Sequence, residues 1–276
     1  MIDLGLLLGK VSQICYTLAR KEANLRLGGI TDMSTIDWYG NVSMVVFWAG
    51  CNLKCPYCHN STLIPLDSGT LVDLSLLDER LTQGMQPVPS LDAVVFSGGE
   101  PTLQKNAVIE AAKLVKDHDL LLMLDTNGTI YSAIKEILTT GLIDRVALDV
   151  KAPLNSESMG VVSQVPEKAQ QHTASIKKSI KLCNKLGIPV EARTTVAPVI
   201  SDDDAFIRQI AQDIQGCVDV YYLQQFDNQG DVLSPELKDK KMPDKEELIS
   251  LAKAAIEEGV DNVYIKTRVN GLERIR

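Results

Sequence analysis

The chain has 276 residues, 45% hydrophobic and 23% charged, a composition typical of a globular protein with a large core. Its formal net charge of −8 argues against a broad nucleic-acid-binding surface. No run approaches the roughly 20 apolar residues that a membrane helix needs, and the start MIDLGLLLGK lacks the cleavage site of a secretory signal. We therefore expect a cytoplasmic protein that binds neither nucleic acid nor membrane.

Apolar side chains repeat at helical spacing over residues 3–22, which predicts an amphipathic helix that ends at Gly28-Gly29 and leads into a loop around Asp37-Trp38-Tyr39-Gly40. Strand-like runs then follow at 42–48, 92–97, 120–125, 145–150, 188–195 and 219–224. Helical patterns alternate with them at 71–83, 104–117, 130–139, 169–186, 202–214 and 244–258. This alternation predicts a parallel α/β sheet, with Val263-Tyr264-Ile265 as a short edge strand. The sequence contains no evident interdomain linker, so we expect residues 1–276 to form one domain.

Each predicted strand ends in an unusual polar motif. In chain order these motifs are GCNLKCPYCHN, SGGEP, DTNG, DVK, RTT and QQF. Open parallel sheets and barrels both place their chemistry at the carboxyl ends of the strands. The sequence therefore predicts one functional site at this edge.

Three of the six cysteines, Cys51, Cys55 and Cys58, lie within eight residues. Thiolates this close bind soft metals. A structural zinc site usually takes two pairs of ligands, and His59 adjoins Cys58 too closely to complete a tetrahedron easily. An iron–sulfur cubane normally takes four thiolates, so three would leave one iron open to a substrate. Both metal sites remain possible at this point, with iron–sulfur favoured.

The remaining candidates read as structural. The other cysteines, Cys15, Cys183 and Cys217, lie in apolar sequence and are expected to pack in the core. His118 and His172 flank or enter helices in polar sequence and are expected to face solvent, as is the basic stretch Lys238-Asp239-Lys240-Lys241.

The spacing Cys51-x3-Cys55-x2-Cys58, with Tyr57 before the third cysteine, is similar to the signature of the radical S-adenosylmethionine (SAM) superfamily. Together with SGGEPTLQ, DTNG, DVKAP, RTTVAP and LQQF, it makes the chain resemble the anaerobic ribonucleoside-triphosphate reductase activating proteins, relatives of pyruvate formate-lyase activating enzyme. The resemblance implies a partial (β/α)6 barrel of parallel strands and a [4Fe–4S] cluster with SAM on its open iron. It covers a core of residues 37–276 and leaves residues 1–30 as an N-terminal helical extension.

The resemblance also implies a set of SAM contacts. Glu100 would meet the methionyl ammonium beside glycines that let the backbone approach a ligand closely, although a turn residue is the simpler interpretation. Asp125, Thr126 and Asp149 would hold a monovalent cation, and Asp125 could instead cap a helix. The implied SAM-site residues are Tyr57, Gly98, Gly99, Glu100, Asp125, Asn127, Asp149, Lys151 and Arg193.

One position departs from the pattern. Phe226 stands where pyruvate formate-lyase activating enzyme has a histidine, so Gln224 or Gln225 is expected to supply that contact. The implied reaction is reductive cleavage of SAM, with an electron from flavodoxin or ferredoxin, and hydrogen abstraction from a glycine of an anaerobic ribonucleotide reductase. The alternatives are another glycyl-radical enzyme, a small molecule such as a pterin or deazaguanine precursor, or a zinc-stabilised binding module without catalysis.

Overall fold

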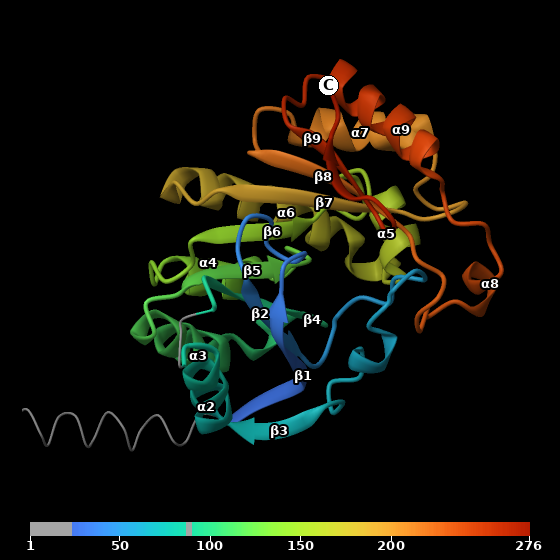
Figure 1. The fold of residues 1–276 in the computed structure, drawn as a ribbon. Helices are drawn as coiled ribbons and strands as arrows, with labels where there is room; N and C mark the ends of the chain where they lie inside the picture. Colours follow the sequence, from blue (N-terminus) through green and yellow to red (C-terminus); the bar gives the residue numbers. More distant parts are fainter. Residues whose placement is uncertain (1–23, 87–89) are drawn as a thin grey trace, which may run out of the picture.

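A computed structural model describes residues 24–86 and 90–276 (Figure 1). The helix expected over residues 3–22, together with Cys15, lies outside the described residues. None of the helices in the described ranges is long and apolar enough to cross a bilayer.

The described strands form one open ten-stranded sheet in the order β10-β9-β8-β7-β6-β5-β4-β2-β1-β3. Neighbours from β2 through β9 pair in parallel, whereas β1, β3 and β10 pair antiparallel at the two ends. The end strands β3 and β10 do not pair with each other, so the sheet is a partial barrel, as predicted. The strands are β1 (Asn24–Ser34), β2 (Ser43–Trp48), β3 (Thr70–Asp73), β4 (Ala93–Gly98), β5 (Leu121–Thr126), β6 (Arg145–Asp149), β7 (Val190–Val196), β8 (Val220–Gln225), β9 (Val263–Thr267) and β10 (Gly271–Arg274).

Helices connect the parallel strands and cover one side of the sheet (Figure 1). Aspartate side chains cap the first turns of several helices; Asp244 and Glu247, for example, form a reciprocal capping box at α9. The α-helices are α2 (Leu74–Gly84), α3 (Lys105–Asp117), α4 (Tyr131–Leu138), α5 (Ser156–Ser163), α6 (Ala169–Leu186), α7 (Asp204–Ile214), α8 (Pro235–Lys238) and α9 (Lys245–Glu257). Short 3-10 turns are η1 (Ser61–Leu63), η2 (Pro101–Gln104) and η3 (Pro166–Lys168).

The six predicted strands are confirmed, and so are the six helices, except that residues 71–73 of the first predicted helix belong to strand β3. The segment before them is not as expected. Residues 24–30 do not end a helix and enter a loop; they begin β1. Gly28 is the extra residue of a bulge, because Leu27 pairs with Trp48 and Gly29 with Phe47. A Cβ atom at Gly28 would lie 2.4 Å from the end of the Leu63 side chain, which would then have to move.

The last predicted strand is also more than an edge. Val263–Thr267 forms β9, which pairs with β8 in parallel and with β10 on its other side. This brings Lys266 to the same edge of the sheet as the other strand-end motifs. The sequence of β10 is too short and polar to predict a further strand.

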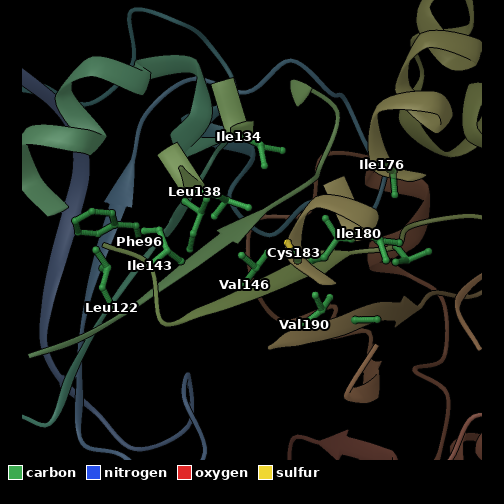
Figure 2. Close-up of a cluster of buried hydrophobic side chains, with 14 of the residues drawn as sticks. Phe96, Leu122, Ile134, Leu138, Ile143, Val146, Ile176, Ile180, Cys183 and Val190 are labelled. Carbon is green, nitrogen blue, oxygen red and sulfur yellow. The ribbon is translucent and has the colours of Figure 1, made fainter. Parts of the chain in front are cut away.

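The sheet buries both faces, as a parallel sheet does. Its helix-covered face forms the main core, where Phe96, Leu122 and Val146 meet Ile134 of α4 and Ile180 of α6 (Figure 2). The alternate strand residues form a second cluster on the concave face, away from the helices. That cluster consists of Trp38, Val45, Ala93, Val95, Met123 and Ala147.

The loop between β1 and β2 closes the amino end of the concave face. Trp38 is only 7% exposed and fills the interior there. Arg193 of β7 donates a hydrogen bond to the Asp37 carbonyl at 3.1 Å, and Lys266 of β9 donates to the Ile36 carbonyl at 2.9 Å. The loop thus bridges from β2 to the far strands of the open sheet and forms the floor of the barrel.

We expect Trp38→Ala to lower the free energy of unfolding by about 3–5 kcal/mol, because removing a buried aromatic leaves a cavity. The neighbouring Tyr39 is 69% exposed, so Tyr39→Ala is the matched control and should change stability little. Denaturant titration of both variants measures the difference. Equal, small losses in both would show that Trp38 does not support the floor.

The expectations for the remaining histidines, cysteines and basic stretch have mixed outcomes. His172 is 3% exposed on the inner face of α6, so the expectation that it is solvated is wrong; its helical position, rather than its polar neighbours in sequence, decides its burial. His118 is half-buried, with Nε2 at 2.8 Å from Asp78. Cys183 is buried in the core and Cys217 packs partly against it, as expected. The stretch 238–241 is exposed, also as expected.

Candidate active site

A cavity of about 330 Å³ opens at the carboxyl ends of the parallel strands. The predicted convergence of strand-end motifs is therefore seen in the structure. Eleven of the twelve candidate residues line this cavity; Glu100 is the exception. The lining candidates are Cys51, Cys55, Tyr57, Cys58, Gly98, Gly99, Asp125, Asn127, Asp149, Lys151 and Arg193.

The three cysteines lie in the loop that follows β2. Gly50 turns the chain with φ 89°, and backbone hydrogen bonds from Gly50 and Cys51 to Leu63 and Ile64 hold the start of the loop. Burial raises the pKa of the Cys51 thiol to about 12 and of the Cys55 thiol to about 11. Both thiols are therefore protonated until a metal displaces the protons.

The arrangement of the thiols bears on the kind of metal centre. Over residues 24–86 and 90–276, no three His, Cys, Asp or Glu side chains converge on a position for a single ion. In a cubane cluster three thiolates bind three different irons and leave the fourth iron open. The three thiols that line the cavity supply such a donor set.

The glycines of the Ser97–Glu100 segment pack against the cysteine loop. A side chain at Gly98, where φ is 111°, would lie 2.5 Å from the Trp48 backbone, and one at Gly99 would lie 2.2 Å from the Gly50 carbonyl oxygen. Gly99 N–H donates to the Trp48 carbonyl at 2.8 Å, and Glu100 N–H to the Gly50 carbonyl at 2.7 Å. Glycine is therefore needed at both positions because two segments of the protein approach each other closely there. Both glycines also line the cavity.

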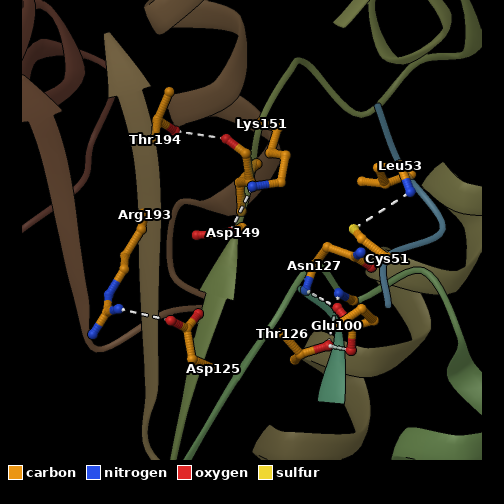
Figure 3. Close-up of polar contacts among 12 residues, drawn as sticks. Cys51, Leu53, Glu100, Asp125, Thr126, Asn127, Asp149, Lys151, Arg193 and Thr194 are labelled. Carbon is orange, nitrogen blue, oxygen red and sulfur yellow. Dashed lines mark hydrogen bonds and ion pairs between the residues drawn. The ribbon is translucent and has the colours of Figure 1, made fainter. Parts of the chain in front are cut away.

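Glu100 is fully buried behind the cavity wall and its carboxylate binds protein groups (Figure 3). Its Oε1 accepts hydrogen bonds from the Thr102 amide and hydroxyl and, at 2.7 Å, from the Thr126 hydroxyl. Its Oε2 accepts from the Asn127 amide at 2.7 Å. Burial raises the pKa of Glu100, and these donors oppose the shift. Glu100 therefore anchors the Asp125–Gly128 loop.

The anchored loop in turn holds the cysteine loop. Asn127 Nδ2 donates to Asn52 Oδ1 at 2.9 Å, and Asn52 Nδ2 donates to the Thr129 hydroxyl at 2.8 Å. Asn52 directly follows the first cysteine of the motif. A continuous set of hydrogen bonds thus links Glu100, Asn127 and Asn52, joining three strand-end motifs around the cavity.

Two carboxylates on the far wall are each paired with a protein cation (Figure 3). Asp125 accepts from Ser97 at 2.7 Å and forms an ion pair with Arg193 at 3.3 Å. Asp149 forms an ion pair with Lys151 at 2.6 Å. Any monovalent cation on these carboxylates would compete with the two side chains for the same oxygens.

Burial and charge oppose each other at these groups. Burial raises the pKa of Asp125 to about 6 despite the nearby guanidinium of Arg193. For Lys151, burial favours the neutral amine, but the Asp149 carboxylate more than offsets it and holds the pKa well above its usual value. The wall thus presents a fixed ammonium group beside the cysteine loop.

Tyr57 belongs both to the cavity wall and to a buried apolar cluster. It lines the cavity, and it is 3% exposed in an apolar cluster with Leu53, Cys55 and Phe226. Its hydroxyl has no hydrogen-bond partner within the described part of the chain, and burial raises its pKa well above the usual value. Its ring therefore serves packing beside the cysteines.

Phe226 is fully buried, and its ring lies 5.7 Å from that of His59. Of the two glutamines expected to substitute for a histidine contact, Gln224 lines the cavity. Gln225 instead donates to the Pro243 carbonyl and accepts from the Arg268 amide. Gln224 is thus the one placed to contact a ligand.

The sequence did not predict several residues of the cavity wall. Lys266 could have been found by treating residues 263–267 as a full parallel strand, because its end then joins the other motifs. Asp37 enters from the antiparallel β1–β2 hairpin, and no sequence signal places it there. The main additions are Asp37, Phe47, Ser97, Thr195 and Lys266.

Together, the fold and site define a parallel α/β partial barrel with a thiol-bearing cofactor cavity at its carboxyl edge. A family model described as the Radical SAM superfamily matches residues 45–210. A Methanocaldococcus jannaschii protein named as a glycyl-radical enzyme activating enzyme is 39% identical over 246 residues, which cover 89% of this chain and 97% of that protein. The chain belongs to the radical SAM superfamily and, within it, to the glycyl-radical enzyme activating enzymes. It is therefore an enzyme that uses a [4Fe–4S] cluster and SAM.

Two further comparisons agree. The pyruvate formate-lyase-activating enzyme of Clostridium pasteurianum is 28% identical over 194 residues, covering 69% of this chain and 76% of that enzyme. A radical SAM methyltransferase structure from Sphaerobacter thermophilus superposes with a TM-score of 0.66 at 13% identity, covering 83% of this chain and 67% of that one. The latter supports the fold alone. Membership of this superfamily overturns the alternative of a zinc-stabilised module without catalysis.

Proposed function

We propose that this enzyme activates an anaerobic ribonucleotide reductase by abstracting a hydrogen atom from a glycine Cα of that partner. The observation that carries the proposal is the ordered set of strand-end motifs, from GCNLKCPYCHN to LQQF, which resembles the reductase activating proteins motif by motif and lines one cavity. A low-potential donor such as flavodoxin or ferredoxin supplies the electron. The three free cysteines of the loop suit a reducing compartment, in keeping with the cytoplasm.

The cavity residues have distinct roles in this proposal. Cys51, Cys55 and Cys58 hold the cluster, while the Lys151 ammonium binds the SAM carboxylate and Gln224 a polar group of SAM. When bound and reduced, the cluster and SAM together supply hydrogen-atom abstraction at the cost of one external electron. The chain holds these groups in place and excludes water. The wall residues Tyr57, Gly98, Gly99, Asp125, Asn127, Asp149 and Arg193 complete the SAM site.

A direct experiment tests the proposed partner. The anaerobically reconstituted protein is mixed with reductant, SAM and the large subunit of an anaerobic ribonucleotide reductase from the same organism. We expect a glycyl-radical EPR doublet and 5′-deoxyadenosine formed in step with it. Omitting SAM is the control and should abolish both signals.

Two other outcomes would change the assignment. A doublet only with a different glycyl-radical enzyme would keep the chemistry and replace the partner. Absence of a doublet with every such enzyme, together with SAM cleavage stimulated by a small molecule, would move the substrate class to metabolites.

We further propose that the chain, residues 1–276, works as one catalytic domain whose core extends beyond residues 37–276. The sheet runs without a break from β1 to β10, so the unit includes β1 and begins no later than Asn24. Limited proteolysis under native conditions should leave this unit intact.

A further inference from the structure

The turn that follows β7 is strained and exposes an apolar side chain. Val199 has φ 57°, in the left-handed region that β-branched residues strongly disfavour. Of the three non-glycine residues with positive φ in the described ranges, the other two are Asp119 and Gln164. The Val199 side chain is nevertheless 75% exposed, so its own burial does not offset the strain.

The surrounding structure imposes this conformation. Ile200 N–H donates to the Ala197 carbonyl at 3.2 Å across a turn with Pro198 in second place and Val199 in third, where glycine or asparagine is usual. The buried Ser201 hydroxyl donates to the Thr195 carbonyl at 2.6 Å and accepts from the Ala197 amide at 2.9 Å. The turn is therefore rigid, and Val199 is fixed at its tip.

The base of the turn belongs to the active site. Thr195 lines the cavity, and Ala197 packs in the same apolar cluster as Cys55 and Tyr57. Four residues span at most about 14 Å, so Val199 stands within that distance of Thr195. The strained tip therefore stands at the carboxyl edge of the sheet, where the cavity opens; we call this edge the rim.

Other strand-end segments contribute exposed apolar side chains to this edge of the sheet. In the described chain, one follows each parallel strand except β5, with exposures between 37% and 90%. Apolar side chains exposed at this edge are suited to contact with a polypeptide. The six residues are Leu66, Leu103, Val161, Val199, Leu233 and Val269, of which Val161 lies within α5.

We propose that Val199 is a preformed contact for the polypeptide substrate: an apolar side chain of the glycine-bearing segment of the glycyl-radical partner packs against it at the rim. The inference rests on the proposed function and deepens it. A rigid tip loses little conformational entropy on binding, which gives a contact to an otherwise mobile segment at low cost. The strain is retained because glycine or asparagine, which would relieve it, would remove the contact.

Val199→Asn separates the two roles of the residue. Asparagine tolerates positive φ, so the variant should melt at a temperature no lower than the wild type. Its apparent KM for the ribonucleotide reductase large subunit should rise about tenfold, as expected when one valine contact of about 1.4 kcal/mol is lost. SAM cleavage by the reduced enzyme without partner should be unchanged. Leu186→Ala, at an exposed leucine ending α6 on the opposite edge, is the control and should alter neither KM nor cleavage.

The outcomes distinguish this inference from the proposed function. Failure of the wild-type enzyme to form a glycyl radical on any glycyl-radical enzyme would overturn both. Normal activation by the wild type with an unchanged KM in Val199→Asn would overturn only the contact. Sedimentation velocity adds a third arm: a wild-type dimer that Val199→Asn dissociates would assign the turn to a second copy of this chain and overturn the proposal.

Discussion

Replacing Cys55 by alanine is expected to leave the reconstituted protein without a [4Fe–4S] cluster. Cys55 is 5% exposed and lies between the other two thiols of the loop, so its loss leaves two ligands that cannot hold the cubane. Iron and sulfide content, visible absorbance and the EPR spectrum of the reduced protein measure the effect. The expected loss is complete.

Cys217→Ala is the matched control, because Cys217 packs partly against the core away from the cavity. It should keep the full iron content. One tightly bound zinc and no iron in the reconstituted wild-type protein would contradict the cluster assignment.

The second large effect is expected at Glu100. In Glu100→Gln, the side-chain amide nitrogen replaces one carboxylate oxygen. It must therefore face either the Asn127 N–H or the hydroxyls that donate to the carboxylate in the wild type. Losing a charge-assisted hydrogen bond and placing two donors together costs about 1.5–3 kcal/mol. We expect SAM affinity to fall by about 10–100-fold, because the Asp125–Gly128 loop is no longer anchored.

A measurement without SAM distinguishes a positioning role of Glu100 from direct binding of SAM by Glu100. Through Asn127 and Asn52, the Glu100 carboxylate also restrains the cysteine loop. A chelator should therefore remove iron from Glu100→Gln faster than from the wild type even when SAM is absent. Normal iron loss combined with weak SAM binding would instead make Glu100 a direct SAM ligand.

Asn52→Ala provides the matching partner for a double-mutant cycle. If Glu100 acts through Asn127 and Asn52, the two substitutions should be strongly non-additive in SAM affinity. Additive losses would indicate independent contacts with the ligand.

Local pattern predicted most of the sheet. Runs such as Val94–Phe96 are apolar on both faces because a parallel strand between helices and a barrel interior has no exposed face. The edge strands were harder to predict from the sequence. Strand β1 carries Gly28-Gly29, and paired glycines also occur at helix ends, while β10 is short. Bulges depend on what the neighbouring segment requires, here the Leu63 side chain, and that segment is remote in sequence.

The amino-acid sequence by itself determined the chemistry of the site. The spacing of Cys51, Cys55 and Cys58 specifies a three-thiol loop, and placing each motif directly after a strand ensures that the motifs meet at one edge, because parallel strands share a direction. Residue types at strand ends therefore sufficed to predict many of the residues that line the cavity, although not Asp37, Phe47 or Lys266.

Only the tertiary structure decided what several of those side chains do. Glu100 and Gly99 have the sequence of a ligand-binding motif, yet Glu100 accepts a hydrogen bond from Asn127 and Gly99 packs against Gly50, both in neighbouring loops. Likewise, Trp38 fills the barrel and Lys266 reaches its floor through contacts between residues up to 230 positions apart. Hydrogen-bond partners and burial depend on which segments the folded chain brings together, and local pattern carries no record of such distant pairs.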